Sequence, residues 1–293
     1  MTSSILESMW RVNDAAPHIS DWNDEYVQVV SGGLLGDGCM VLRERMVTPS
    51  YHENHGWRQR DYVIWKCRIL GASMGEYTTF DKRTCRFYAR STLWITDQRN
   101  HGLYSVFYPT GKKIVSPEVL DHVGDLGLTV LWLDDGSTKL HDGNGKLSLQ
   151  SFSPPENRMI MSWLRDRYEI NSVLSTENEI FLNSRELPKL LSVVYPIFQR
   201  YGLPECMRYK MGSLDPKNSE SIEAAKEKRR EHDMTNYWRI MSDSSRRKKR
   251  RERMKKGARR RLEDPKYREK YNDYHRVYAR VWRARHAKES NPA

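Results

Sequence analysis

Two apolar nonapeptides stand out in the pattern of hydrophobic and polar positions, and each of them ends in Asp-Gly. The first occupies residues 30–38 and the second residues 128–136, so their final aspartates, Asp37 and Asp135, lie 98 residues apart. Each segment has the length and apolar content of a buried helix, with glycine after its last turn, where glycine is favoured. The pattern therefore predicts two equivalent helices, each with a carboxylate at its end.

Small residues in the first apolar segment predict how these two helices pack. Gly32 and Gly36 are four residues apart and so share one face of a helix, where the absence of side chains lets another helix backbone come close. The second segment has Val130 and Asp134 at the equivalent positions. We therefore expect an asymmetric crossing, in which the larger residues of one helix rest on the glycines of the other.

Period-two alternation after the first segment predicts strands with one polar face. One strand is expected over residues 39–46, a second around residues 58–60, and the clearest over residues 84–91. An antiparallel sheet can leave one face in water, and an arginine-rich face can contact phosphates and base edges in a major groove. The residues expected on this face are Arg43, Arg45, Arg58, Arg60, Arg86, Tyr88 and Arg90.

The second half repeats this pattern with fewer charges. Two strands are expected on either side of a glycine-rich turn at residues 141–145. Their outward positions are Lys139, Lys146, Ser148 and Gln150. A second polar sheet face is therefore predicted.

Helical segments follow the strands in both halves. Residues 62–70 form an aromatic-faced helix closed by Gly71, and Ser153 begins a capping box that opens a helix to about Tyr168. A hairpin is expected over residues 173–183, followed by a helix capped by Ser184. Each half therefore has the order α, β, β, α, β, β, α, which predicts the α+β class with helices on one side of an antiparallel sheet.

Spacing within the halves supports an internal repeat. Trp65 and Trp163 each lie 28 residues after the preceding Asp-Gly aspartate, and Lys113 and Lys210 lie 76 and 75 residues after it. Landmarks that keep their offsets are expected of a duplicated unit. The offset favours Lys113 as the counterpart of Lys210, although Lys112 stays open.

The two nonapeptides resemble the paired signature motifs of the LAGLIDADG homing endonucleases. The segments Tyr108-Pro-Thr-Gly-Lys-Lys113 and Met207-Arg-Tyr-Lys210 look like the lysine-bearing segments of that family, and the resemblance covers roughly residues 25–213. The first motif departs from the name-giving sequence, with Gly-Gly-Leu-Leu-Gly before its aspartate, which is a common form in the family. The resemblance implies two pseudo-symmetric halves in one chain, whose sheets form a DNA-binding saddle, and a monomer that mimics a dimer.

The resemblance also implies a catalytic site. Asp37 and Asp135 take the position of the acidic metal ligands, with Mg²⁺ or another divalent cation as the cofactor, and Lys113 and Lys210 match lysines that assist cleavage of double-stranded DNA. Electrostatics also favours a cation, because helix C-termini are negative and two neighbouring carboxylates repel each other. Hard oxygen ligands suit Mg²⁺ or Ca²⁺. The segment His52-Glu-Asn-His55 lacks a third ligand and is expected to be a polar loop.

Composition sets the class of protein. Hydrophobic residues make up 38% and charged residues 30% of the 293 residues, which is typical of a globular protein with a very polar part attached. Neither a membrane span nor a signal peptide is expected. The protein is therefore expected in the cytoplasm, associated with the nucleoid, while an organelle or the nucleus stays open. The four cysteines match no zinc pattern.

Positive charge is concentrated at the end of the chain. Residues 222–293 contain 25 Lys and Arg against 11 Asp and Glu, whereas residues 1–221 contain 25 against 27. A cationic tail binds polyanions through counterion release with little sequence preference. The expected domains are a lead-in at 1–24, a first half at 25–120, a second half at 121–213 and a basic, mostly helical nucleic-acid-binding tail at 222–293.

Three functions compete at this point. The first is a DNA endonuclease that uses a divalent cation to hydrolyse phosphodiesters in both strands. The second is a maturase that binds intron RNA, and the third is a regulator that binds DNA without cutting it. The two acidic positions and both lysines favour the endonuclease. An intein is not expected, because the chain begins with Met1 and shows no flanking splicing segments.

Overall fold

A computed structural model gives the structure of the chain. It describes residues 19, 21–44, 46–81, 86–139, 142–215, 218–266, 268–269, 272–273 and 276, with only the backbone described at residues 86, 258, 260 and 262. Contacts divide the chain into two compact units, Met1–Lys226 and Glu227–Ala293. The first unit contains both halves of the predicted repeat.

Each half of the first unit contains helices and four strands in the predicted order. The elements of the first half are α2 (Glu25–Leu35), β1 (Cys39–Val41), β2 (Ser50–Gly56), the short 3₁₀ helix η1 (Trp57–Gln59), α3 (Arg60–Leu70), β3 (Ser73–Asp81), β4 (Arg86–Thr96), α4 (Arg99–Phe107) and α5 (Pro117–His122). Those of the second half are α6 (Asp125–Asp135), β5 (Gly136–Lys139), β6 (Asn144–Leu147), α7 (Pro154–Tyr168), β7 (Val173–Leu174), β8 (Ile180–Leu182), α8 (Leu187–Arg200) and the 3₁₀ segment η2 (Glu205–Leu214).

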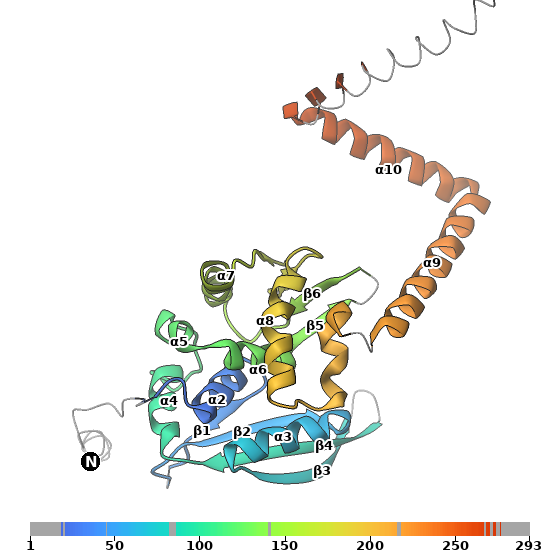
Figure 1. Ribbon diagram of the computed structural model, residues 1–293. Helices are drawn as coiled ribbons and strands as arrows, with labels where there is room; N and C mark the ends of the chain where they lie inside the picture. Colours follow the sequence, from blue (N-terminus) through green and yellow to red (C-terminus); the bar gives the residue numbers. More distant parts are fainter. Residues whose placement is uncertain are drawn as a thin grey trace, which may run out of the picture. The chain divides into compact units, whose positions relative to one another are not determined.

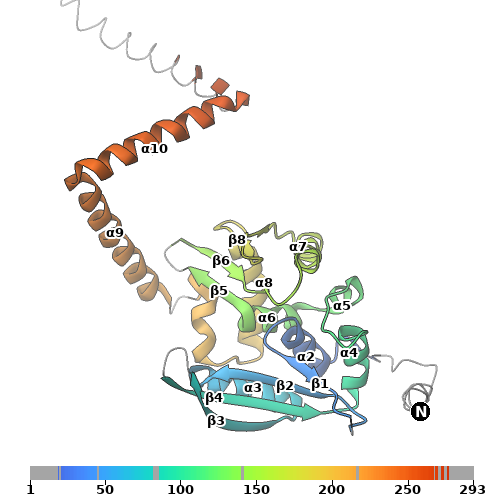
Figure 2. The same cartoon turned by 180° about the vertical axis from the view of Figure 1, so that it is seen from behind.

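The two sheets have the same topology. Their strand orders are β1-β2-β4-β3 and β5-β6-β8-β7, and all neighbouring strands in both sheets are antiparallel. Helices α2 and α6 lie between the two sheets in both views (Figures 1 and 2). The predicted α+β class with two pseudo-symmetric halves is therefore confirmed.

Close packing of α2 on α6 depends on the glycines of α2. A Cβ atom at Gly32 would lie 2.3 Å from the carbonyl oxygen of Gly127 and 2.8 Å from the Cβ of Val130. A Cβ atom at Gly36 would lie 2.7 Å from the Cβ of Asp134. Real Cβ atoms do not come this close to other heavy atoms, so α2 carries glycine where α6 carries larger side chains, and the crossing is asymmetric.

Local signals define the ends of several helices. Asp24 caps α2 by accepting a hydrogen bond of 3.1 Å from the backbone N–H of Val27, and α3 ends at Gly71, whose φ of 64° is left-handed. Helix α7 begins with a complete capping box of Ser153 and Glu156. The end of α3 and the start of α7 lie where the sequence predicts them.

The strand expected around Arg58 and Arg60 is wrong. Arg58 lies in η1 and Arg60 begins α3, while the strand itself is β2, over Ser50–Gly56. The segment expected to be a polar loop is therefore the middle of a strand. Its inward-facing residues are largely polar, so the hydrophobic alternation that normally reveals a strand is missing.

Other predicted boundaries also shift. Strand β1 ends at Val41, so Arg43 lies beyond it, and Arg45 lies outside the described residues. Strand β6 ends at Leu147, so Ser148 and Gln150 follow the strand instead of extending it. The N-cap of α8 is Glu186 and not Ser184, because the side chain of Asn183 accepts the N–H groups of residues 185 and 186 and forms the preceding turn.

The second unit is helical and strongly basic. Helix α9 (Ser219–Ser242) enters it from the first unit, and α10 (Ser244–Glu263) contains twelve lysines and arginines against two glutamates. Asp243 caps α10 by accepting the N–H groups of Ser245 and Arg246. Among the described helices, none combines the length and the apolar character that crossing a membrane requires.

Candidate active site

The two predicted acidic residues lie at the ends of the paired helices. Asp37 follows the C-cap of α2, and its side chain is 41% exposed. Asp135 is the last residue of α6 and is partly buried. Because the helices cross through the glycines of α2, both carboxylates are carried to the same region of the first unit.

Each of the two helix ends is capped by one of the predicted lysines. The ammonium group of Lys113 donates hydrogen bonds to the backbone carbonyls of Gly36 and Gly38, at 3.4 and 2.8 Å. The ammonium group of Lys210 donates to the carbonyls of Leu133 and Asp134, the latter at 2.8 Å. A cation at a helix C-terminus offsets the negative end of the helix dipole, so the lysines are bound to the same two turns that carry the aspartates.

The electrostatics of this region show that the acidic groups are crowded. Burial, together with the charges of Asp37 and Asp134, raises the pKa of Asp135 to about 7, against the opposing effect of Lys210 and Lys113. Burial also lowers the pKa of Lys113 and of Lys210, against the attraction of the same carboxylates. Like charges held together in this way are stabilised by a cation.

A buried ionic network lies beside Asp37 and was not predicted as part of the site. The ammonium group of Lys66 is fully buried between Glu53 of β2 and Asp134 of α6, and it lies 2.9 and 3.0 Å from the two Asp134 oxygens. His55 donates to the Glu53 carboxylate through Nε2, and its Nδ1 lies 3.8 Å from Oδ2 of Asp37. The network thus joins the ends of both helices through one strand.

Two tyrosines complete the network. The hydroxyl of Tyr51 donates to Glu53 at 2.6 Å, and the hydroxyl of Tyr62 donates to Asp134 at 2.9 Å. Both side chains are fully buried. A Cβ atom at Gly33 or Gly38 would lie only 2.0 or 2.5 Å from the Tyr51 hydroxyl, so these glycines make room for the polar layer.

The directions of the pKa shifts favour the charged forms of the two basic members of the network. The pKa of Lys66 is raised, because Asp134 and Glu53 outweigh the effect of burial. Burial also opposes the charge on His55, but the neighbouring Glu53 carboxylate raises its pKa. Glu53 itself has a lowered pKa, since Lys66 and His55 outweigh its burial. A buried charge is tolerated only when it is paired in this way.

The donor atoms of this region fit a divalent cation. Asp37, His55 and Asp134 each offer one ligand atom, and these atoms lie within 4.8 Å of one another. Both Asp134 oxygens are already paired with Lys66, and burial raises the pKa of Asp134 and that of Asp135 alike, to about 7. Asp37 and Asp135 stay the predicted pair of oxygen ligands for a hard cation.

Sequence signals for the missed residues were present but weak. His55 and Glu53 belong to the polar segment of β2, and Asp134 is the first aspartate of Asp-Asp-Gly. Lys66 lies four residues after the buried Tyr62 on α3, so a charge on the buried face of the helix is the signal that marks it. Proximity of these residues comes only from the packing of α3, β2 and α6.

The open face of the first sheet carries several residues predicted to contact DNA. Tyr88 and Arg90 of β4 share this face with His52 and Trp94, which pair across β2 and β4. Arg43 lies at one end of the face, in a hollow of about 450 Å³ that is also lined by His52 and Trp94. Arg90 of β4 and Arg43 are therefore brought to one surface, and the backbone of Arg86 is on the same strand.

Arg58 and Arg60 are not on this face of the sheet. Arg60 projects from the start of α3, forms an ion pair of 2.6 Å with Glu76 and lies over the ring of Trp57. Arg58 is exposed in η1. The structure therefore separates these two arginines from the residues of β4 with which they were predicted to act.

The corresponding face of the second sheet is smaller. Lys139 of β5 and Lys146 of β6 lie on one side of the sheet, because Lys146 pairs with Ser137, which is two residues before Lys139 and shares its face. Lys146 and Gln150 both bind the carboxylate of Glu179, at 2.5 and 2.6 Å. Ser148 donates its backbone N–H to the carbonyl of Asp135, which ties the end of β6 to the acidic site.

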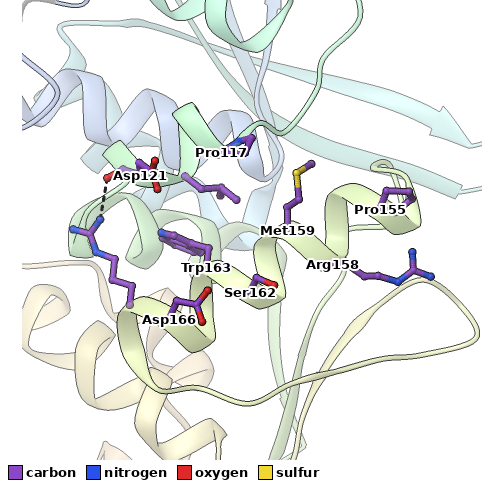
Figure 3. A pocket seen from close by; sticks show the side chains of 10 residues that line it. Pro117, Asp121, Pro155, Arg158, Met159, Ser162, Trp163 and Asp166 are labelled. Carbon is purple, nitrogen blue, oxygen red and sulfur yellow. Dashed lines mark hydrogen bonds between the residues drawn. The ribbon is translucent and has the colours of Figure 1, made fainter.

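A groove of about 700 Å³ between α5 and α7 is unrelated to the acidic site. Leu120 of α5 and Met159 and Trp163 of α7 supply its apolar walls, and Arg167 binds the carbonyl of Asp121 at its edge (Figure 3). None of the predicted catalytic residues lines it. Its size alone does not make it the reactive site.

The comparisons with known proteins identify the family. A profile of the LAGLIDADG DNA endonuclease family matches residues 27–186, more than half of the chain. The chain therefore belongs to the LAGLIDADG DNA endonuclease family. This match includes both motif helices and both sheets.

Solved structures agree with the fold. The homing endonuclease I-WcaI, bound to its DNA recognition sequence, aligns with a TM-score of 0.56 and 15% identity over 70% of this chain and 96% of that chain. At this identity the similarity shows the fold alone.

Curated relatives carry different names. The chain is 26% identical over 208 residues to the protein RecA of Mycobacterium gastri, covering 64% of this chain and 47% of that protein. It is 24% identical over 209 residues to the cytochrome b mRNA maturase bI2 of Debaryomyces hansenii, covering 64% of this chain and 74% of that protein. The chain thus spans less than half the length of this RecA relative.

Proposed function

We propose that this chain is a site-specific endonuclease that cuts both strands of double-stranded DNA by hydrolysing phosphodiesters with the help of a divalent cation, preferably Mg²⁺. The observation that carries this proposal is the repeated helix end. Asp37 and Asp135 end the paired helices, and Lys113 and Lys210 bind the carbonyls of the same turns. A protein that only binds DNA gains nothing from crowding carboxylates in this way.

The aspartates and the lysines at the two helix ends have different roles in the proposed reaction. Asp37 and Asp135 hold the cation, which when bound lowers the pKa of water and neutralises charge on the phosphate. The lysines stabilise negative charge near the scissile phosphate through their compact cationic groups. Because both halves are in one chain, we propose that the protein acts as a monomer.

The open sheet faces form the proposed DNA-binding surface. A two-stranded ribbon fits the major groove, and arginine can bind guanine through two hydrogen bonds. Similarity in fold to I-WcaI, which is bound to its DNA recognition sequence, supports this use of the sheets. The residues proposed to contact DNA are Arg43, Arg86, Tyr88, Arg90, Lys139 and Lys146.

Cleavage of a plasmid that carries the intronless version of the host locus tests the proposal. We expect linear product with Mg²⁺ and none with EDTA. Asp37→Asn and Asp135→Asn should keep DNA affinity, because they relieve carboxylate repulsion, but should abolish double-strand cleavage. Lys113→Met and Lys210→Met should slow cleavage less completely.

Lys112→Met serves as the matched control. Lys112 neighbours Lys113 but interacts with Glu156 rather than with the helix ends, so its loss should leave the cleavage rate within about twofold, as is usual for surface changes. Cleavage of both strands at the wild-type rate by Asp135→Asn would reject the proposed metal site.

A maturase function is the second candidate. Similarity to the cytochrome b mRNA maturase over 74% of that protein is the observation that favours it, and the basic second unit suits RNA as well as DNA. Specific binding of the host intron RNA with no cleavage of DNA under any divalent cation would favour the maturase. Specific DNA binding without cleavage would instead favour a regulator.

A further inference from the structure

The two halves of the first unit differ in one buried layer. Strand pairing allows the halves to be aligned, because Cys39 and Ser137 each lie two residues after their helix-end aspartate. Cys39 pairs with His52 and Ser137 pairs with Lys146. Position by position, Glu53 therefore corresponds to Leu147 and His55 to Leu149.

The same comparison extends to the helix behind each sheet. Trp65 and Trp163 are equivalent by spacing, so Lys66 corresponds to Leu164. All six residues are at least 98% buried, with exposures of 1, 2 and 0% for the polar set and 0, 1 and 0% for the leucines. One fold thus packs three leucines in its second half where it packs a glutamate, a histidine and a lysine in its first.

Stability does not explain this replacement. Burying paired charges in place of well-packed apolar side chains is often neutral or destabilising, and the second half shows that this architecture accepts the apolar set. Buried ionisable groups are concentrated at functional sites. A role connected with the adjacent acidic residues is therefore the more economical explanation.

The contacts of the polar set lead to both helix ends. His55 Nδ1 faces Oδ2 of Asp37 at 3.8 Å, while Lys66 holds both oxygens of Asp134, the residue before Asp135. Glu53 binds both His55 and Lys66. The second half has leucines at these positions, so its side of the site has no equivalent connection.

We propose that Glu53, His55 and Lys66 are positioning residues that fix the Asp37 carboxylate and the end of α6 for only one of the two strand cleavages. This inference rests on the proposed endonuclease function. It implies that the two strand cleavages depend on the network to different degrees. The network neutralises Asp134 with Lys66, leaving Asp37 and Asp135 for the cation. Partners of metal ligands orient the ligands and tune their affinity.

Strand-resolved nicking of a plasmid that carries the target site, with each strand labelled separately, tests this inference. His55→Leu introduces the residue of the second half and should slow cleavage of one strand by roughly tenfold to a hundredfold. It should slow cleavage of the other strand by less than about threefold. His55→Gln keeps a polar group towards Asp37 and should recover part of the lost cleavage rate. Mn²⁺ titration of the DNA-free protein, followed by electron paramagnetic resonance, should show weaker binding in His55→Leu.

The variant E53L/H55L/K66L/D134A replaces the charged members of the network, including the carboxylate that Lys66 neutralises, and leaves the buried hydroxyls of Tyr51 and Tyr62 in place. It should fold, because the second half packs the same leucines, and it should show the same strand bias and weaker Mn²⁺ binding. Leu149→Val is the control, since it perturbs the equivalent position of the second half without a polar contact. It should leave the strand ratio unchanged.

Several outcomes would overturn the inference. If the variants cleave both strands equally slowly and bind Mn²⁺ with unchanged affinity, the network is purely structural. If the quadruple variant cleaves DNA and binds Mn²⁺ as the wild-type protein does, the network is dispensable. If the wild-type protein cuts no DNA, the proposed function fails, and the Mn²⁺ titration then decides this inference on its own. Unchanged Mn²⁺ affinity in that case would reject it.

Discussion

Lys66 shows how much one residue can couple in this protein. Its ammonium group is fully buried and contacts Glu53 of its own half and Asp134 of the other half. It also lies 4.6 Å from the centre of the Tyr62 ring. A single lysine thus joins β2, α3 and α6, and its removal would leave Asp134 without its paired cation and Glu53 paired with His55 alone.

We predict that Lys66→Met destabilises the protein by about 3 to 5 kcal/mol, because removing one partner of a buried ion pair leaves the other uncompensated. Urea unfolding measures this change. Arg60→Met is the matched control on the same helix, since the Arg60–Glu76 pair is about 40% exposed on both sides and such pairs contribute at most about 1 kcal/mol. Equal losses in the two variants would contradict the network's buried character.

Gly32 gives a second prediction at the scale of a single residue. Gly32→Ala places a methyl group 2.3 Å from a backbone oxygen of α6, and the resulting overpacking should lower the free energy of unfolding by about 3 kcal/mol. Gly56→Ala is the control, because Gly56 has open space and an extended backbone with φ −66°. It should change stability by no more than about 1 kcal/mol. A tolerated Gly32→Ala would mean that the helices cross elsewhere.

Among the elements, α7 shows how one side chain ties two segments together. Glu156 accepts the backbone N–H of Ser153 at 2.7 Å and the backbone N–H of Val115 at 3.0 Å. Val115 belongs to the connection between α4 and α5. The capping box of α7 therefore also anchors the segment that follows Lys113.

The capping glutamate predicts a pH dependence. Burial opposes ionisation of Glu156, but its hydrogen bonds to Ser153 and Val115 outweigh burial and lower its pKa. Its contribution to stability is therefore present above the pKa of the unfolded chain, about 4.3, and is lost as the pH falls through the lower folded pKa. Glu156→Ala should destabilise by about 1 to 2 kcal/mol at neutral pH and by less in acid.

Urea unfolding at a series of pH values measures this dependence. Glu177→Ala, in the exposed turn between β7 and β8, should show no such trend. A Glu156→Ala difference that stays constant down to pH 3 would assign the stabilisation to packing rather than to the carboxylate.

At the scale of the whole molecule, the two units differ in charge and are expected to contribute differently to DNA binding. The structured halves bring arginines to one sheet face, whereas α10 carries basic residues all around a single helix. Phosphate contacts fix a protein on DNA without reading sequence, and base contacts supply specificity. The second unit is therefore expected to add affinity and little selectivity.

We predict that removing residues 227–293 weakens binding to all DNA sequences and reduces the slope of log K against log salt concentration, because fewer counterions are released. Fluorescence anisotropy with specific and random duplexes at several salt concentrations measures both effects. As a control in the full-length chain, six arginines of α10 are replaced by glutamine. This variant should show the same change in the slope of log K against log salt concentration. Loss of preference for the specific duplex would instead show that the second unit reads sequence.

The sequence by itself determined the repeat and its helix ends. Apolar nonapeptides ending in Asp-Gly, glycines at helical spacing and lysines at constant offsets are local or periodic signals, and they predicted α2, α6, Asp37, Asp135, Lys113 and Lys210 as equivalent sets. The order of helices and strands followed from the same periodicity, and it is confirmed. Such signals suffice because each depends on neighbouring residues in the chain.

Only the tertiary structure decided which polar residues are buried together. Strand β2 was missed because its inward side carries Glu53 and His55 instead of apolar residues, and the arginines at 58 and 60 were assigned to it in error. Lys66 meets Asp134 across 68 positions of the chain, a pairing that no local pattern encodes. Burial of charge becomes visible only when the helices and the sheet have packed, because only then does each ion acquire its partner.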